Sequence, residues 1–93
     1  MESIHGELAG RMIRMYTTQW CPDCVRAKTF LKEHHIPFEE IHLESTPGAA
    51  EFVMRVNEGK RRVPTFEIAD RTFHCSPYDP RKLSRELGIA AAK

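Results

Sequence analysis

The sequence predicts one α/β domain whose elements follow the order β-α-β-α-β-β-α. Stretches with strand-like composition alternate along the chain with amphipathic stretches at helical spacing. A chain of 93 residues has room for a single modest core, and 41% hydrophobic against 29% charged residues is the balance of an ordinary globular protein. We expect the domain at residues 11–89, between a flexible extension at 1–10 and a tail at 90–93.

The first strand and the first helix are predicted on either side of a cysteine motif. Residues 11–16 mix apolar and polar side chains as a strand does, and the two threonines that follow extend this composition. Pro22, directly after Cys21, suits the first turn of a helix, because its fixed φ is helical and its missing N–H would have no helical partner. The helix is expected to extend to about His35 and to end before Pro37.

A second strand and a second helix are predicted next. Residues 38–43 alternate imperfectly, and Ser45-Thr46-Pro47 is typical of a capped helix start. The apolar stripe of this helix has the spacing i, i+3, i+4, i+7, and it consists of Ala49, Phe52, Val53 and Val56. Asn57 and Gly59 supply its stop. The first β-α-β unit requires a parallel strand pair with a right-handed crossover.

The last third of the chain predicts a β-hairpin. Beyond the basic segment Lys60-Arg61-Arg62, residues 63–68 have the composition of a strand that is entered through a proline. Residues 69–71 can turn this strand back into residues 72–75. A hairpin at this position completes the strands.

Two start signals compete for the final helix. Either Ser76-Pro77 or Asp79-Pro80 can begin it, and the sequence does not choose between them. The helix carries Leu83 and Leu87 four positions apart, and Gly88 is its expected stop.

Charge and cysteine count narrow the class of protein. Fourteen Lys and Arg against 13 Asp and Glu leave a formal net charge of +1, so no net field attracts nucleic acid or an anionic membrane. The first ten residues have no apolar run, and we expect neither a signal peptide nor a membrane anchor but a cytoplasmic protein. Three cysteines are too few for a secreted disulfide scaffold, so a close pair suggests redox catalysis or metal binding.

The segment Cys21-Pro22-Asp23-Cys24 carries the main chemical signal. Two thiols three positions apart at a helix start lie within reach of each other, and the free N–H groups and partial positive charge there stabilise a thiolate. We predict that Cys21 is the nucleophile and Cys24 the resolving thiol. Because Asp23 repels a neighbouring thiolate, Cys21 is expected to be less acidic than it would be beside a neutral residue.

Two other interpretations of the cysteine pair remain. Cys-x-x-Cys is also the commonest zinc spacing, but the chain lacks a second Cys or His pair at similar spacing, so we expect no metal. A purely structural disulfide is the other alternative, and it is uncommon in the cytoplasm.

Between residues 12 and 89 the chain resembles the glutaredoxins, and more closely the mycoredoxins. The resemblance is carried by residues 16–24 (YTTQWCPDC), by Val56-Asn57-Glu58-Gly59 and by residues 61–65 (RRVPT), in the family's order and spacing. It implies a thioredoxin fold, with a four-stranded mixed sheet flanked by three helices. It also implies a cis peptide bond before Pro64, beside Cys21, with the Val63 backbone pairing with substrate; otherwise Pro64 simply begins a strand.

The resemblance further implies a site for glutathione. It assigns substrate or glutathione binding to Trp20, Pro22, Arg61, Arg62, Val63, Pro64 and Ser76, with the arginines in the loop before the proline and Ser76 at the start of the last helix. The basic segment is equally well interpreted as a solvated charge run. Two departures bear on glutathione: Thr18 stands where many glutaredoxins have Lys, and His74-Cys75 replaces a Gly-Gly pair that lets the ligand approach the backbone.

Cys75 and Trp20 each have two interpretations. By the resemblance Cys75 lies near the active-site end of the sheet, where it is either a third redox thiol or a small buried side chain, and we favour burial. Trp20 either shapes the surface beside Cys21 or packs inside.

The predicted function is that of a monomeric thiol-disulfide oxidoreductase that reduces protein disulfides or glutathione mixed disulfides. It needs no tightly bound cofactor, and its expected partners are glutathione or a similar thiol, client proteins and a thioredoxin reductase, but neither nucleic acid nor membrane. The alternative is an iron–sulfur carrier in which the Cys21 thiol and two glutathiones bridge a cluster between protomers. Pro22 argues against it, because cluster binders of the family tend to have a small residue there.

Overall fold

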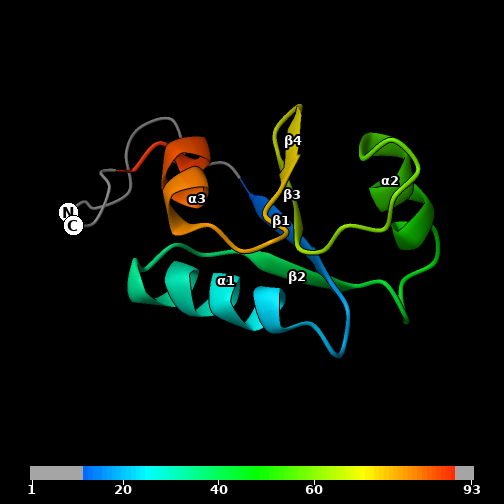
Figure 1. Cartoon of the computed structure of the whole chain (residues 1–93), viewed down its shortest axis with the longest axis horizontal. Coiled ribbons are helices and arrows are strands. Elements are labelled where there is room, and N and C mark those ends of the chain that lie inside the picture. The colour runs from blue at the N-terminus through cyan, green and yellow to red at the C-terminus, as the bar shows by residue number, and fades with distance from the viewer. Residues whose placement is uncertain (1–11, 90–93) are drawn as a thin grey trace.

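The structure is a computed structural model that describes residues 12–89, and it has the predicted order of elements (Figure 1). The strands and helices in chain order are β1 (Ile13–Thr17), α1 (Pro22–Glu33), β2 (Glu39–His42), α2 (Ala49–Val56), β3 (Thr65–Ile68), β4 (Arg71–His74) and α3 (Pro80–Leu87). The extension expected at residues 1–10 and the tail at 90–93 lie outside the described residues.

The four strands form one mixed sheet in the order β2-β1-β3-β4. β1 is parallel to β2 and antiparallel to β3, and β3 is antiparallel to β4, so the predicted parallel pair and the predicted hairpin are both confirmed. Met15 in β1 stands opposite Glu40 in β2 and Phe66 in β3. The carboxyl end of the central strand β1 leads directly to the cysteine motif.

Two separate cores cover the two faces of the sheet. Because successive side chains of a strand point to opposite faces, Met15 and Tyr16 belong to different cores. The Met15 side packs against α1 and α3 through Ala27, Phe30, Leu31, Leu83 and Leu87. On the other face Tyr16 packs against Ala49 and Val53 of α2. Figure 1 accordingly shows the strands between α3 and α2.

Asp79 decides where the final helix begins. Its carboxylate accepts the backbone N–H groups of Arg81 and Lys82 at 3.0 and 3.3 Å, and Pro80 occupies the first helical position. The competing signal Ser76-Pro77 contains a cis peptide bond and belongs to the connection between β4 and α3. The placement of Ser76 at a helix start was therefore wrong.

The second helix and the third strand also begin later than predicted. Gly48, with φ of 84°, precedes α2 and provides no side-chain cap, so the predicted cap at Ser45-Thr46-Pro47 was wrong. A left-handed residue closes the turn here, and glycine adopts that conformation without steric cost. The paired part of β3 starts at Thr65 and leaves Val63 and Pro64 outside the ladder.

None of the helices within residues 12–89 has the length and apolar character needed to cross a membrane.

Candidate active site

Cys21 and Cys24 form a disulfide at the beginning of α1. Cys21 is the N-cap residue, and its Sγ accepts the backbone N–H of Cys24 at 3.0 Å. Pro22 follows at the first helical position, which confirms the predicted start of this helix. The exposed fraction is 9% for Cys21 and 2% for Cys24, so both residues are buried and Cys21 is the more accessible of the two.

The loop that leads into β3 lies directly beside this cysteine pair. The Val63–Pro64 peptide bond is cis, as the resemblance implied. The carbonyl oxygen of Val63 is 3.8 Å from Cys21 Sγ, and the carbonyl oxygen of Pro64 accepts the N–H of Cys75 at 3.0 Å. The structure therefore brings Cys21, Val63, Pro64 and Cys75 together from three distant parts of the chain.

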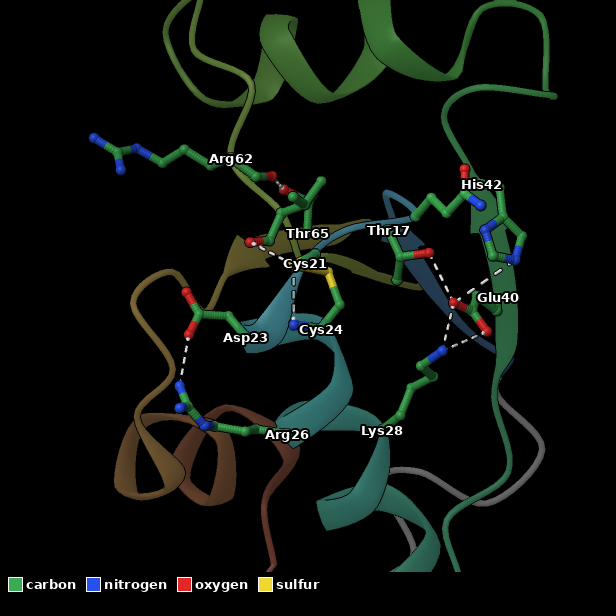
Figure 2. The surroundings of a disulfide bond; sticks show 12 residues. Thr17, Cys21, Asp23, Cys24, Arg26, Lys28, Glu40, His42, Arg62 and Thr65 are labelled. Atoms are coloured by element: carbon green, nitrogen blue, oxygen red, sulfur yellow. Dashed lines mark hydrogen bonds and ion pairs between the residues drawn. A yellow bond between two sulfur atoms is a disulfide. The ribbon is translucent and has the colours of Figure 1, made fainter.

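A buried polar network holds this loop in place. Asn57 Nδ2 donates to the carbonyl oxygen of Val53 at 2.8 Å and to Thr65 Oγ1 at 2.9 Å. Thr65 Oγ1 in turn donates to the carbonyl oxygen of Arg62 at 2.6 Å (Figure 2). Asn57 was predicted as a helix stop and as part of the family motif, but not as a support of this loop. The polar residues Asn57 and Thr65 at the two ends of the basic loop were the signal for this role.

On the other side of the cysteine pair lies a charged cluster that the sequence analysis missed. Glu40 in β2 accepts hydrogen bonds from Thr17 Oγ1 at 2.8 Å and from Lys28 Nζ at 3.0 Å, and His42 Nε2 is 3.7 Å away (Figure 2). Burial raises the pKa of Glu40, but hydrogen bonds from Thr17 and Lys28 and the charges of Lys28 and His42 lower it, and the net pKa is below its usual value. Lys28 lies one helical turn after Cys24, so this cluster joins α1 to β2.

Asp23 is paired with Arg26 rather than left alone at the start of α1. Its carboxylate is 3.3 Å from the Arg26 guanidinium, whose side chain is 63% exposed. An exposed guanidinium offsets the negative charge only in part, because water screens it. The predicted effect of Asp23 on the acidity of Cys21 is therefore reduced by this pair but not removed.

The exposed residues next to Cys21 form a surface of mixed character. Trp20 is 86% exposed and Pro22 is exposed, so Trp20 does not pack inside. Arg61 is exposed and Arg62 half-buried, and Figure 2 shows the Arg62 side chain extending away from the disulfide. Both arginines therefore lie in the loop that precedes Val63. The Arg62 side chain does not point toward the sulfur atoms.

Cys75 is fully buried, and its thiol contacts two backbone atoms of Asp79. Cys75 Sγ accepts the backbone N–H of Asp79 at 3.3 Å and lies 3.4 Å from the carbonyl oxygen of the same residue. Burial raises the pKa of the Cys75 thiol, with a smaller opposing effect from the Asp79 hydrogen bond. The thiol is therefore neutral near pH 7 and fastens the connection between β4 and α3.

Within the part of the chain that the structure describes, no three His, Cys, Asp or Glu side chains come together as metal ligands.

A cysteine pair at the start of the first helix, facing a cis-proline loop on this mixed sheet, defines a thiol redox protein of the thioredoxin fold. The family model for glutaredoxin matches residues 13–73, and on that ground the chain belongs to the glutaredoxin family. It is a glutaredoxin-like oxidoreductase whose redox-active pair is Cys21 and Cys24.

Individual relatives agree with this assignment. The chain is 43% identical over 65 residues to a Mycobacterium tuberculosis protein provisionally named a glutaredoxin, covering 70% of this chain and 77% of that one. It is 32% identical to mycoredoxin 1 of Corynebacterium glutamicum over 78 residues, or 84% and 96% of the two chains. Among solved structures, the thioredoxin-like protein BC3987 superposes with a TM-score of 0.62 at 28% identity, covering 81% and 97%.

Proposed function

We propose that the protein reduces protein disulfides and glutathione mixed disulfides, with Cys21 as the nucleophile and Cys24 as the resolving thiol. The observation that carries this assignment is the asymmetry of the pair. Cys21 is 9% exposed and its Sγ accepts the N–H of Cys24 at 3.0 Å, whereas Cys24 is 2% exposed. The same N–H and the helix N-terminus stabilise a Cys21 thiolate, which is the form that attacks disulfides.

The reaction proceeds by two exchanges of sulfur. The Cys21 thiolate attacks one sulfur of the substrate disulfide, forms a mixed disulfide and releases the other sulfur as a thiolate. Cys24 then loses its proton and attacks Cys21 Sγ, which releases the second substrate thiolate and leaves the Cys21–Cys24 disulfide. When the group held on Cys21 is glutathione, a second glutathione thiolate can attack it in place of Cys24 and leave as glutathione disulfide. Two electrons pass to the substrate, and a thiol reductant restores the pair.

The backbone of Val63 is proposed to hold the substrate during the first exchange. Val63 lies outside the paired part of β3, and its carbonyl oxygen is 3.8 Å from Cys21 Sγ. An extended substrate segment that pairs with this backbone would place its disulfide against Cys21. Trp20 and Pro22, the exposed neighbours of Cys21 in the sequence, provide contact surface for a client protein.

Glutathione is the proposed reductant, since the glutaredoxin family uses it as a co-substrate. Arg61 and Arg62 supply positive charge for its carboxylates next to Val63. Ser76 is the proposed contact from the connection before α3, where its backbone N–H donates to His74 Nδ1 at 3.3 Å. We place the protein in the cytoplasm as a monomer, with disulfide-containing or thiolated proteins as clients and a thioredoxin reductase as the competing electron source.

Reduction of a glutathionylated peptide tests the proposal. The wild type is compared with Cys21→Ser, Cys24→Ser and Cys75→Ser variants, once with glutathione and once with thioredoxin reductase as electron source. We expect activity with glutathione that requires Cys21, survives the loss of Cys24 and is unchanged without Cys75. If activity required both Cys21 and Cys24 and was supported only by the reductase, the electron source would be the reductase and not glutathione. Activity without Cys21 would refute the mechanism.

A further inference from the structure

The turn between β1 and α1, which leads into Cys21, is fastened to the segment that follows β2. The backbone N–H of Gln19 donates to the carboxylate of Glu44 at 2.9 Å. At the neighbouring residue, the N–H of Leu43 donates to the carbonyl oxygen of Thr17 at 2.9 Å. These two hydrogen bonds hold the carboxylate of Glu44 against the turn that precedes the nucleophile.

The negative charge of Glu44 is therefore close to the reactive cysteine. Gln19 is two residues before Cys21, so the carboxylate oxygen bonded to its N–H lies at most about 12 Å from the Cα atom of Cys21. The Debye length is about 8 Å at physiological ionic strength and about 30 Å at 0.01 M salt. A charge on an incoming substrate consequently interacts with Glu44, and most strongly at low salt.

Glu44 carries a charge that no ion pair neutralises. Within the described part of the chain, no basic side chain forms an ion pair with it. The hydrogen bond from the Gln19 N–H is the main cause that lowers the pKa of Glu44 below its usual value, so the exposed carboxylate is ionised near pH 7. Asp23, the carboxylate in the first turn of α1, is instead paired with Arg26.

The loop before the cis-proline borders the same region with positive charge. Val63, whose carbonyl oxygen is 3.8 Å from Cys21 Sγ, also packs against the core cluster that includes Leu43, the neighbour of Glu44. The charge of Arg61 in this loop acts on the Glu44 carboxylate. A disulfide that approaches Cys21 therefore meets charges of both signs.

We propose that Glu44 is a specificity-determining residue, whose carboxylate disfavours disulfides with negatively charged substituents at Cys21 and favours those with positively charged ones. The inference rests on the proposed function and deepens it, because it concerns the charge class of the substrates. A fixed charge beside a reaction site selects substrates by repulsion and attraction, while the exchange of sulfur stays the same. Glu44 thereby opposes the attraction that Arg61 and Arg62 exert on substrate carboxylates. Without it, clients with Asp or Glu beside the target cysteine would react faster relative to those with Lys or Arg.

The experiment compares three small disulfides as oxidants of the reduced protein. Cystamine carries two ammonium groups, bis(2-hydroxyethyl) disulfide is neutral, and 3,3′-dithiodipropionate carries two carboxylates. Mass spectrometry after a rapid quench with N-ethylmaleimide gives each second-order rate constant at pH 7 and low ionic strength. The variant is Glu44→Gln, which keeps an acceptor for the Gln19 N–H but has no charge.

We expect Glu44→Gln to raise the ratio of the dithiodipropionate rate constant to the cystamine rate constant by about fourfold. Each rate constant should change by about twofold in opposite directions relative to the neutral disulfide, the size of the interaction of two unit charges about 10 Å apart in water. The ratio cancels any common effect of the variant on the acidity of Cys21. The change in the ratio should disappear in 1 M salt, where the Debye length is about 3 Å.

Glu33→Gln is the matched control. It makes the same change of net charge at an exposed residue near the end of α1, about 18 Å along the helix from Cys21, and it should leave the ratio unchanged. If Glu44→Gln changed all three rate constants by one factor, Glu44 would only hold the turn, and the inference would be overturned. An equal effect of Glu33→Gln would overturn it as well. Failure of the proposed function looks different, because none of the three disulfides would then oxidise the wild type.

Discussion

Asn57 at the end of α2 donates its side-chain amide to the hydroxyl of Thr65 at 2.9 Å, and both side chains are buried. Thr65 is the first paired residue of β3, and its hydroxyl donates to the carbonyl oxygen of Arg62. The two hydrogen bonds join the end of a helix to both ends of the loop that carries Val63 and Pro64. The position of the loop beside Cys21 therefore depends on a side chain seven residues before the proline.

Asn57→Ala should destabilise the protein and loosen this loop. The variant leaves buried partners without their donor, which costs about 2 kcal/mol and lowers the melting temperature by about 10 °C. Thermal unfolding followed by circular dichroism measures the effect, with Glu58→Gln, a change at the exposed neighbour, as the control. Equal melting temperatures for Asn57→Ala and the wild type would show that the network does not hold the loop.

Asp23→Asn should increase the thiolate fraction of Cys21. The negative charge lies two residues from the sulfur in the first turn of α1, and its partner Arg26 is largely exposed. Its removal is expected to speed alkylation of reduced Cys21 by iodoacetamide at pH 6 by about twofold to threefold, the size of a screened charge effect. Arg26→Gln, which unpairs Asp23, should slow the same reaction. A change in the same direction for both variants would contradict this account.

Glu40→Gln should destabilise the protein at neutral pH but not in acid. The pKa of Glu40 is lowered in the folded state, so its ionised form stabilises the fold above the unfolded-state pKa of about 4.3, and this stabilisation is lost as the pH falls through the lower folded-state value. We expect a loss of about 1–2 kcal/mol at pH 7, because Thr17 and Lys28 lose a charged acceptor. Urea unfolding at pH 7 and pH 3 measures the difference between the two proteins.

Glu39→Gln is the matched control for this prediction. Glu39 neighbours Glu40 in β2, but its ion pair with Arg14 is exposed on both sides, with side-chain exposures of 56% and 50%. Exposed pairs contribute about 0–1 kcal/mol, so this variant should change stability little at either pH. A pH-independent loss for Glu40→Gln would indicate a packing role instead of a charge.

Cys75 should resist thiol reagents in the folded protein. Its side chain is fully buried, and burial raises the pKa of the thiol, so at pH 7 it is neutral as well as inaccessible. Mass spectrometry after iodoacetamide treatment of the reduced protein should find Cys21 modified and Cys75 modified only in denaturant. If Cys75 in the folded protein were labelled as fast as Cys21, the prediction of a buried and unreactive thiol would be wrong, and a third redox thiol would be favoured.

Most of the fold could be predicted because its signals are local. The spacing of apolar residues, the composition of the strands and the proline after Cys21 predicted the order of the elements and the βαβ unit, although the start of α2 was predicted wrongly. Two local signals competed at Ser76-Pro77 and Asp79-Pro80, and only the structure shows that Asp79 caps the helix through the N–H groups of Arg81 and Lys82. Gly48 precedes α2 with a φ of 84°, a left-handed conformation that glycine adopts without steric cost.

The sequence by itself determined the chemistry of this protein, because two cysteines three positions apart at a helix start need no distant partner to form a reactive pair. It also predicted, through the resemblance, the cis bond that lies against Cys21. Only the tertiary structure decided what surrounds the pair. Three contacts join residues from separate segments of the chain: Val63 with Cys21, Asn57 with Thr65, and Arg62 with His74. They depend on how the folded chain brings these segments together, and no spacing in the sequence encodes such distances.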